Sequence, residues 1–263
     1  MNYREEIPNI LYKYRDYSNK YNKRTLFDFE IFLASTSMFN DPYEGAIPFE
    51  YEPEDLTEDN IFLKLREVAT QKYPDWSEDQ IRKHCYEAQK RDLLNNDVHI
   101  AEQNELNRKK INRTFGILSL TGNPLNYLMW SHYGNKHTGY CIGFDKCILN
   151  DIVQGVLSPV TYDLRIPKLR LFESIGNFHK KQLATKYKIW DYEEEYRIVK
   201  GDASKQVIKY PKEMIKRVYL GCKMKYPNKT KIISFIKSND IECEVFQLTL
   251  DNQVFKLNSQ RIN

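Results

Sequence analysis

The stretch WDYEEEYRIV, residues 190–199, does most to decide which fold the chain is expected to adopt. Its Tyr, Ile and Val content is typical of a β-strand, a structure in which Glu is uncommon. Neighbouring side chains of a strand point to opposite faces, so Glu193, Glu195 and Arg197 are expected on one face, with Glu194 on the other. This charged row is either part of a polar site or a solvent-facing ladder of salt bridges.

Further strands and helices are expected on both sides of this stretch. Strands are predicted where β-branched and aromatic residues lie between turn formers. Helices are predicted where capping residues precede apolar residues that recur at helical spacing. The expected strands cover residues 10–15, 30–36, 113–121, 138–145, 157–163 and 217–222, with a hairpin over 241–257. Helices are expected at residues 123–134, 172–187 and 229–238. This order predicts an α+β fold with a mixed, largely antiparallel sheet.

A charged, helix-forming segment interrupts this pattern. Thr57 and Ser77 are each followed by acidic residues, as at helix N-termini, and Ser77 with Gln80 fits a capping box. We therefore predict one α+β domain over residues 1–263 with a helical insertion at residues 54–112. A chain of 263 residues is long enough to bury its own core.

Composition and charge restrict the function classes. No apolar run is long enough to span a bilayer, and the first ten residues lack a secretion signal, so we expect a cytoplasmic protein with no membrane partner. The five cysteines are scattered and odd in number, which argues against a disulfide framework. The formal net charge is +4, and basic residues predominate after Arg197, which is typical of a surface for an anionic partner.

The common catalytic motifs are missing from the sequence. There is no GxxxxGK[ST] phosphate loop, no strand-borne GxGxxG, no HExxH and no GxSxG. His132, His137 and Cys141 follow one another across an expected helix end, turn and strand, in a spacing that fits no common zinc site. We therefore expect no metal.

Four strings of residues resemble those of a known bacterial family. They are LYKYR at residues 11–15, FLASTSMFNDPYE at 32–44, LMWSHYG with HTGYCIGFD at 128–145, and WDYEEEYR at 190–197. They occur in the order found in the family of domain of unknown function 2971, and the chain is identified as a member of it. The resemblance covers nearly the whole chain but supplies no activity by itself.

The order of polar residues on the expected strands also resembles, in outline only, that of the ADP-ribosyltransferase superfamily. That order is a basic residue on a first strand, Ser or Thr on a second and Glu-x-Glu on a late one. That resemblance implies an ADP-ribosyltransferase-like split sheet and NAD as substrate. Cleavage of the nicotinamide–ribose bond passes through an oxocarbenium-like ribose. Glu195 would stabilise that charge and Glu193 would activate the acceptor, so both are predicted to be catalytic.

The resemblance also implies binding roles for other residues. Arg15 suits the pyrophosphate because a guanidinium binds phosphate with two parallel hydrogen bonds. Ser35 and Ser37 would hold the nicotinamide-side ribose, and Trp130 or Tyr133 would stack on a base, although both are alternatively core aromatics. The predicted NAD-binding set is Arg15, Tyr14, Ser35, Ser37, Asn40, Asp41, Trp130 and Tyr133. We expect the first two strands and the Glu-rich strand to be neighbours that close one cleft.

Two other function classes stay open at this point. A metal-dependent nuclease would gather Asp41, Glu44, Glu193 and Glu195 around a divalent cation. A non-catalytic nucleic-acid-binding or sensor module of a defence system would use the basic C-terminal region and the abundant tyrosines. For the transferase we expect a toxin or phage-defence effector, with RNA, DNA or protein as acceptor and a neutralising antitoxin as partner.

Overall fold

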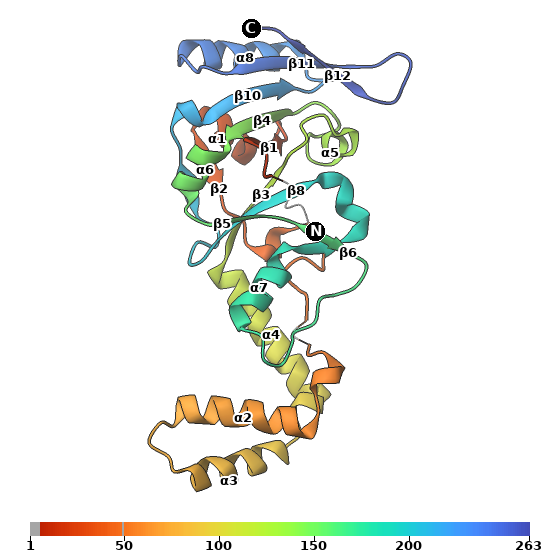
Figure 1. The fold of residues 1–263 in the computed structure, drawn as a ribbon. Coiled ribbons are helices and arrows are strands. Elements are labelled where there is room, and N and C mark those ends of the chain that lie inside the picture. The colour runs from red at the N-terminus through yellow and green to blue at the C-terminus, as the bar shows by residue number, and fades with distance from the viewer. Residues whose placement is uncertain (1–5, 49) are drawn as a thin grey trace.

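The computed structural model describes residues 6–48 and 50–263, and an eight-stranded sheet forms its centre (Figure 1). The strand order is β12-β11-β10-β4-β1-β3-β8-β5, and every neighbouring pair is antiparallel except β10 and β11. The predicted α+β class with a largely antiparallel sheet is confirmed. The strands are β1 (Ile10–Arg15), β3 (Gly116–Thr121), β4 (Tyr140–Asp145), β5 (Val156–Pro159), β8 (Glu195–Lys200), β10 (Ile215–Leu220), β11 (Glu244–Leu250) and β12 (Leu257–Arg261).

Four short strands form two further sheets. β2 (Glu30–Phe32) pairs with β9 (Val207–Lys209), and β6 (Thr161–Asp163) pairs in parallel with β7 (Thr185–Tyr187). The expected order of neighbours was therefore wrong, because β3 separates β1 from β8 and β2 belongs to another sheet. β2 is also shorter than predicted, since a 3₁₀-helix begins at Thr36.

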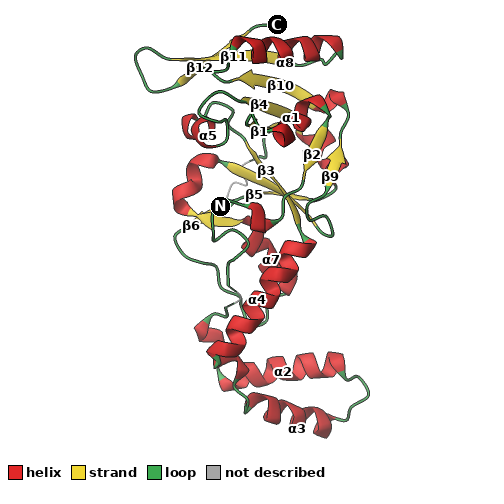
Figure 2. Ribbon diagram, turned by 180° about the vertical axis from the view of Figure 1, so that it is seen from behind, coloured by secondary structure: helices red, strands yellow, loops and turns green. Residues whose placement is uncertain are grey.

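Helices cover the sheet and extend beyond it (Figure 2). The α-helices are α1 (Lys20–Phe27), α2 (Glu58–Lys72), α3 (Glu78–Gln89), α4 (Asp97–Thr114), α5 (Tyr127–His132), α6 (Lys146–Val153), α7 (Ile175–Ala184) and α8 (Tyr226–Ser238). The 3₁₀-helices are η1 (Thr36–Met38), η2 (Pro53–Asp55), η3 (Leu93–Asn95), η4 (Lys188–Glu193) and η5 (Lys212–Met214). The N-cap of α5 is Asn126, so this helix begins later than the expected start at residue 123.

The segment predicted as a helical insertion contains α2, α3 and most of α4. In Figure 1, α2 and α3 lie side by side and project from the sheet on the end of α4. The Thr57 side chain caps α2, and Ser77 with Gln80 forms the expected capping box of α3. Ala69 and Cys85 belong to a small apolar cluster that joins the two helices.

The alternation of side chains along β1 directs two basic residues toward the interior. Leu11 is fully buried in the main core, and Lys13 and Arg15 share its face because they follow at intervals of two residues. Tyr14 points to the other face and packs edge-on against Trp130, with ring centroids 5.2 Å apart. β1 thus contributes Leu11 to the apolar core and presents Lys13 and Arg15 on the same face.

The Glu-rich stretch does not form one strand. Lys188–Glu193 is the 3₁₀-helix η4, Glu194 has a φ of 44°, and β8 begins at Glu195. The left-handed conformation is uncommon for residues other than glycine, and here it redirects the chain from η4 into β8. The prediction that Glu193 lies on the strand was wrong. Glu193 and Glu195 nevertheless turn to the same side, because both carboxylates contact Lys186, while Glu194 is exposed.

Candidate active site

A cavity of about 740 Å³ lies between β1, α1, β3, α5 and the start of β8. This volume falls within the range of small-molecule binding sites. Basic side chains from β1 and acidic side chains from η4 and β8 both line it. Its lining includes the charged and polar residues Lys13, Tyr14, Arg15, Asn40, Glu44, Tyr133, Lys186, Glu193 and Glu195.

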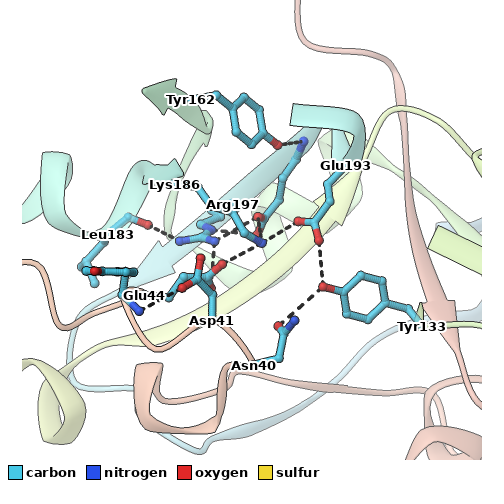
Figure 3. A network of polar contacts seen from close by, with 11 residues as sticks. Asn40, Asp41, Glu44, Tyr133, Tyr162, Leu183, Lys186, Glu193 and Arg197 are labelled. Atoms are coloured by element: carbon cyan, nitrogen blue, oxygen red, sulfur yellow. Dashed lines mark hydrogen bonds and ion pairs between the residues drawn. The ribbon is translucent and has the colours of Figure 1, made fainter. Parts of the chain in front are cut away.

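Lys186 is the centre of a buried ionic network at one side of this cavity (Figure 3). Its Nζ lies 2.7 Å from Glu44 Oε1, 2.6 Å from Glu193 Oε2 and 3.5 Å from Glu195 Oε2. Burial by itself lowers the pKa of Lys186, but the three carboxylates raise it overall, so the amine stays protonated. Lys186 therefore holds three acidic groups together that would otherwise repel one another.

Arg197 holds Glu195 from behind the cavity. The Arg197 Nε and Nη2 atoms donate to the two oxygens of Glu195 at 2.7 and 2.9 Å, and Nη1 donates to the Leu183 carbonyl at 2.7 Å. Arg197 is 1% exposed and does not line the cavity. Burial acts to raise the pKa of Glu195, but Arg197 and Lys186 outweigh it and lower this pKa to about 2. The Glu195 carboxylate is therefore ionised at neutral pH.

Glu193 differs from Glu195 in its protonation chemistry. Burial raises the pKa of Glu193, and the nearby charge of Glu195 acts in the same direction, although Lys186 opposes both. The Tyr133 hydroxyl donates to Glu193 Oε1 at 2.7 Å and lies 3.5 Å from Asn40 Oδ1 (Figure 3). One carboxylate is thus held ionised and its neighbour is adjusted to accept a proton, a division typical of acid–base sites.

The basic wall of the cavity, formed by Lys13 and Arg15, carries charges that form no direct ion pair in the described part of the chain. Lys13 Nζ donates to the Ser119 carbonyl at 2.5 Å, and Arg15 Nε donates to Thr25 Oγ1 at 2.9 Å. Within residues 6–48 and 50–263, neither Lys13 nor Arg15 forms an ion pair with a carboxylate. Burial lowers the pKa of both, that of Lys13 to about 7. Two such cations facing a cavity make a site for an anion.

The structure brings several of the predicted site residues together. Arg15, Tyr14, Asn40, Tyr133, Glu193 and Glu195 all line the one cavity. Tyr14 is almost buried there, and its hydroxyl donates to the Asn123 carbonyl at 2.8 Å, so its role is to shape the wall. The row of Glu193, Glu195 and Arg197 is buried, which rules out a solvent-facing salt-bridge ladder.

Ser35 and Ser37 do not lie where the resemblance implied. The Ser35 hydroxyl donates to the Asn112 carbonyl of α4 at 3.0 Å, and the two serine hydroxyls lie 3.0 Å apart. Neither serine lines the cavity. They cap and lie within η1 instead of following β2, so the turn directs them toward α4 and away from the site. Placing them against a ribose was therefore wrong.

Trp130 and Asp41 also lie outside the cavity. Trp130 is fully buried, its Nε1 donates to the Pro124 carbonyl at 2.9 Å, and it offers no free ring face for a base. Its assignment as a stacking residue was therefore wrong, and the alternative of a core aromatic holds. Asp41 is buried and lines a second, smaller cavity, so its expected contact with NAD was misplaced.

Sequence reasoning missed Lys13 and Lys186 as site residues. Lys13 precedes Arg15 by two residues and so lies on the same face of β1, and the period of the strand could have revealed it. Lys186 fell within an expected helix, but the structure places it on β7. No pattern near Lys186 indicates that its amine meets carboxylates from three different segments.

Comparisons with known proteins give one family match, over part of the chain. Residues 129–198 match the model of a family described as "Protein of unknown function (DUF2971)", which supports the expected resemblance to that family. The matched segment contains Tyr133, Lys186, Glu193, Glu195 and Arg197. No curated protein and no solved structure matches the chain significantly. In the part of the chain that the structure describes, none of the helices has the length and apolar character needed to cross a membrane.

Proposed function

We propose that the cavity binds NAD and that the chain is an ADP-ribosyltransferase. The observation that carries the proposal is the presence, in one cavity, of basic side chains on β1 that form no ion pair with any described residue and of an ionised carboxylate at the start of β8. NAD has the same polarity, with a pyrophosphate at its centre and a ribose that gains positive charge when nicotinamide leaves. Such a ligand would use both walls of the cavity.

The pyrophosphate would bind at Lys13 and Arg15. The Arg15 guanidinium already donates Nε to Thr25, which fixes its plane and leaves its terminal nitrogens for the ligand. Lys13 lies two residues away on the same face and adds a second charge. Binding a phosphate would also offset the cost of keeping these cations buried.

Glu195 would stabilise the ribose as the glycosidic bond breaks. The electron pair of that bond leaves with nicotinamide, and positive charge develops on the ribose. A fixed anion near that charge lowers the barrier, and Arg197 together with Lys186 keeps Glu195 both ionised and in one position. Arg197 is in this scheme a positioning residue, since it does not reach the cavity.

Glu193 would accept the proton of the attacking group. The acceptor forms a bond to the ribose carbon that nicotinamide leaves, and its proton passes to Glu193. The pKa of Glu193 is raised by burial, which makes it a better base than an exposed glutamate. The hydroxyl of Tyr133, 2.7 Å away, orients this carboxylate.

The first test is NAD affinity. Arg15→Gln is expected to weaken NAD binding about 10- to 100-fold, because it removes charge-assisted hydrogen bonds to phosphate worth about 1.5–3 kcal/mol. Isothermal titration calorimetry would measure the dissociation constant. Lys110→Met is the control, since Lys110 is exposed on α4 and lies outside the cavity. Equal affinities for wild type and Arg15→Gln would contradict the placement of the pyrophosphate.

The pH dependence of binding follows from Lys13. Burial lowers the pKa of Lys13 to about 7, so its amine gains a proton below this pH and loses it above. NAD affinity should therefore fall by up to about tenfold between about pH 6 and pH 8, as the charged fraction decreases. In Lys13→Met, NAD affinity should change less with pH. Titrations of both proteins across the range would check it, and parallel slopes would show that Lys13 does not contact the phosphates.

The nuclease alternative receives less support from this geometry. Lys186 Nζ already occupies the position between Glu44, Glu193 and Glu195 that a divalent cation would take. A nuclease would depend on added metal and not on NAD, which separates the two functions in one assay. The proposal extends to a toxin or phage-defence effector whose harm to the host is relieved by an antitoxin. Loss of that harm in Glu195→Gln would support this role.

A further inference from the structure

A second cavity of about 370 Å³ lies directly beside the first. Glu44 and Lys186 line both cavities, so a single ion pair separates them. The second cavity is formed by the loop that follows η1, by β7 and by the segment after β6. None of the roles proposed for NAD uses it.

Asp41 lines this second cavity and carries a buried acceptor that is unused among the described residues. Its side chain is 5% exposed, and Oδ1 accepts from the Tyr43 backbone N–H at 2.9 Å. Its other oxygen, Oδ2, has no hydrogen-bond partner within the described part of the chain. An unsatisfied buried carboxylate oxygen costs free energy, and a ligand that donates an N–H group would remove that cost.

The rim of the second cavity has the composition of a nucleic-acid site. Tyr43 and Tyr187 line it and are 58% and 48% exposed, so their rings are available for stacking. Arg165 also lines it, is exposed, and forms no ion pair within residues 6–48 and 50–263. Aromatic rings that stack on bases and an arginine for the phosphate are the usual parts of a single-strand binding site.

We propose that the second cavity binds a nucleobase of a single-stranded nucleic acid through Asp41 and is the docking site of the acceptor strand. The acceptor role rests on the proposed transferase function, whereas the binding itself does not. A strand docked there would lie one ion pair away from the bound ribose, since Glu44 and Lys186 face both cavities. This arrangement would bring acceptor and NAD together from opposite sides of the network.

Asp41 further predicts which bases bind. A carboxylate accepts hydrogen bonds from the exocyclic amino groups of adenine, cytosine and guanine. Uracil offers one ring N–H between two carbonyl oxygens, and those oxygens repel a carboxylate. Strands rich in amino-bearing bases should therefore bind more tightly than strands of uracil.

Binding of short oligonucleotides without NAD tests the proposal. Fluorescein-labelled hexamers of adenosine, cytidine and uridine would be titrated by fluorescence anisotropy against wild type, Asp41→Asn and Tyr187→Ala. We expect weaker binding of the uridine hexamer to wild type and a loss of this preference in Asp41→Asn, whose amide can donate to carbonyl oxygens. Tyr187→Ala should weaken binding of all three by about 5- to 150-fold through lost stacking.

Controls separate this inference from the proposed function. Tyr226→Ala removes an exposed tyrosine of α8 that lines neither cavity, and it should bind like wild type. Tyr187→Ala should retain wild-type NAD affinity, because Tyr187 does not line the first cavity. Equal binding of all hexamers with no effect of Asp41→Asn, or binding of an arginine-rich peptide in their place, would overturn the inference. That outcome would not contradict the proposal that the chain cleaves NAD.

Discussion

Glu195→Gln is expected to slow NAD cleavage about 10²- to 10³-fold. The amide keeps the shape of the side chain but removes the charge that would stabilise the ribose as nicotinamide leaves. Arg197 and Lys186 would retain Glu44 and Glu193 as partners, so the fold should persist. Because Glu195 is buried, some stability should also be lost, about 1.5–3 kcal/mol for the charge-assisted hydrogen bonds.

The rate of NAD consumption by purified protein would measure this effect, with circular dichroism at the assay temperature to verify folding. Glu194→Gln is the matched control, because Glu194 is adjacent in sequence but exposed, and its carboxylate accepts a hydrogen bond from Asn123 Nδ2 at 2.9 Å. It should retain the wild-type rate. Equal rates for the two variants would mean that the carboxylate of Glu195 is structural.

Arg197→Met is expected to lower the free energy of unfolding by about 3–5 kcal/mol, the usual cost of removing one partner of a buried ion pair. Arg197 is 1% exposed and contacts Glu195, Glu44 and the Leu183 carbonyl, so its loss leaves buried acceptors unpaired.

The folded pKa of Glu195 is depressed from 4.5 to about 2. The stability that this shift contributes is complete above about pH 4.5 and is lost as the pH falls toward 2.

Urea denaturation at neutral pH would measure the change. Arg108→Met is the control, because Arg108 pairs with Glu105 on the surface of α4 with side chains 47% and 43% exposed. Exposed pairs contribute about 1 kcal/mol or less. If Arg197→Met were no more destabilising than Arg108→Met, the buried network would not hold the site together.

Local sequence signals predicted much of the fold. β1 was expected over residues 10–15, where the structure has it, because Ile10, Tyr12 and Tyr14 are of types that favour strands. The capping box at Ser77 likewise placed the start of α3. The prediction of one strand over residues 190–199 was wrong because the residues are strand-forming, whereas the backbone of Glu194 is left-handed and ends the 3₁₀-helix before β8. Single-residue backbone reversals of this kind have no pattern unless glycine marks them.

The candidate site was predictable only where its residues share a strand or a short loop. Arg15 and Glu195 were expected in one cleft and Tyr133 was predicted to bind NAD, and all three line the cavity. Trp130 was misplaced because its aromatic ring fits a core as well as a ligand site. Lys186 could not be found from sequence, since its role arises from carboxylates that lie more than one hundred residues apart along the chain, at Glu44 and Glu193.

Release of nicotinamide from NAD by the purified chain at neutral pH tests the central claim most directly. We expect nicotinamide to appear with wild type and to be nearly absent with Glu195→Gln at equal concentrations of folded protein. Chromatography of the reaction with NAD labelled on the nicotinamide ring would detect it without knowledge of the acceptor. Failure of wild type to release nicotinamide, with added single-stranded RNA, DNA or protein as acceptor and with any antitoxin absent, would contradict the account.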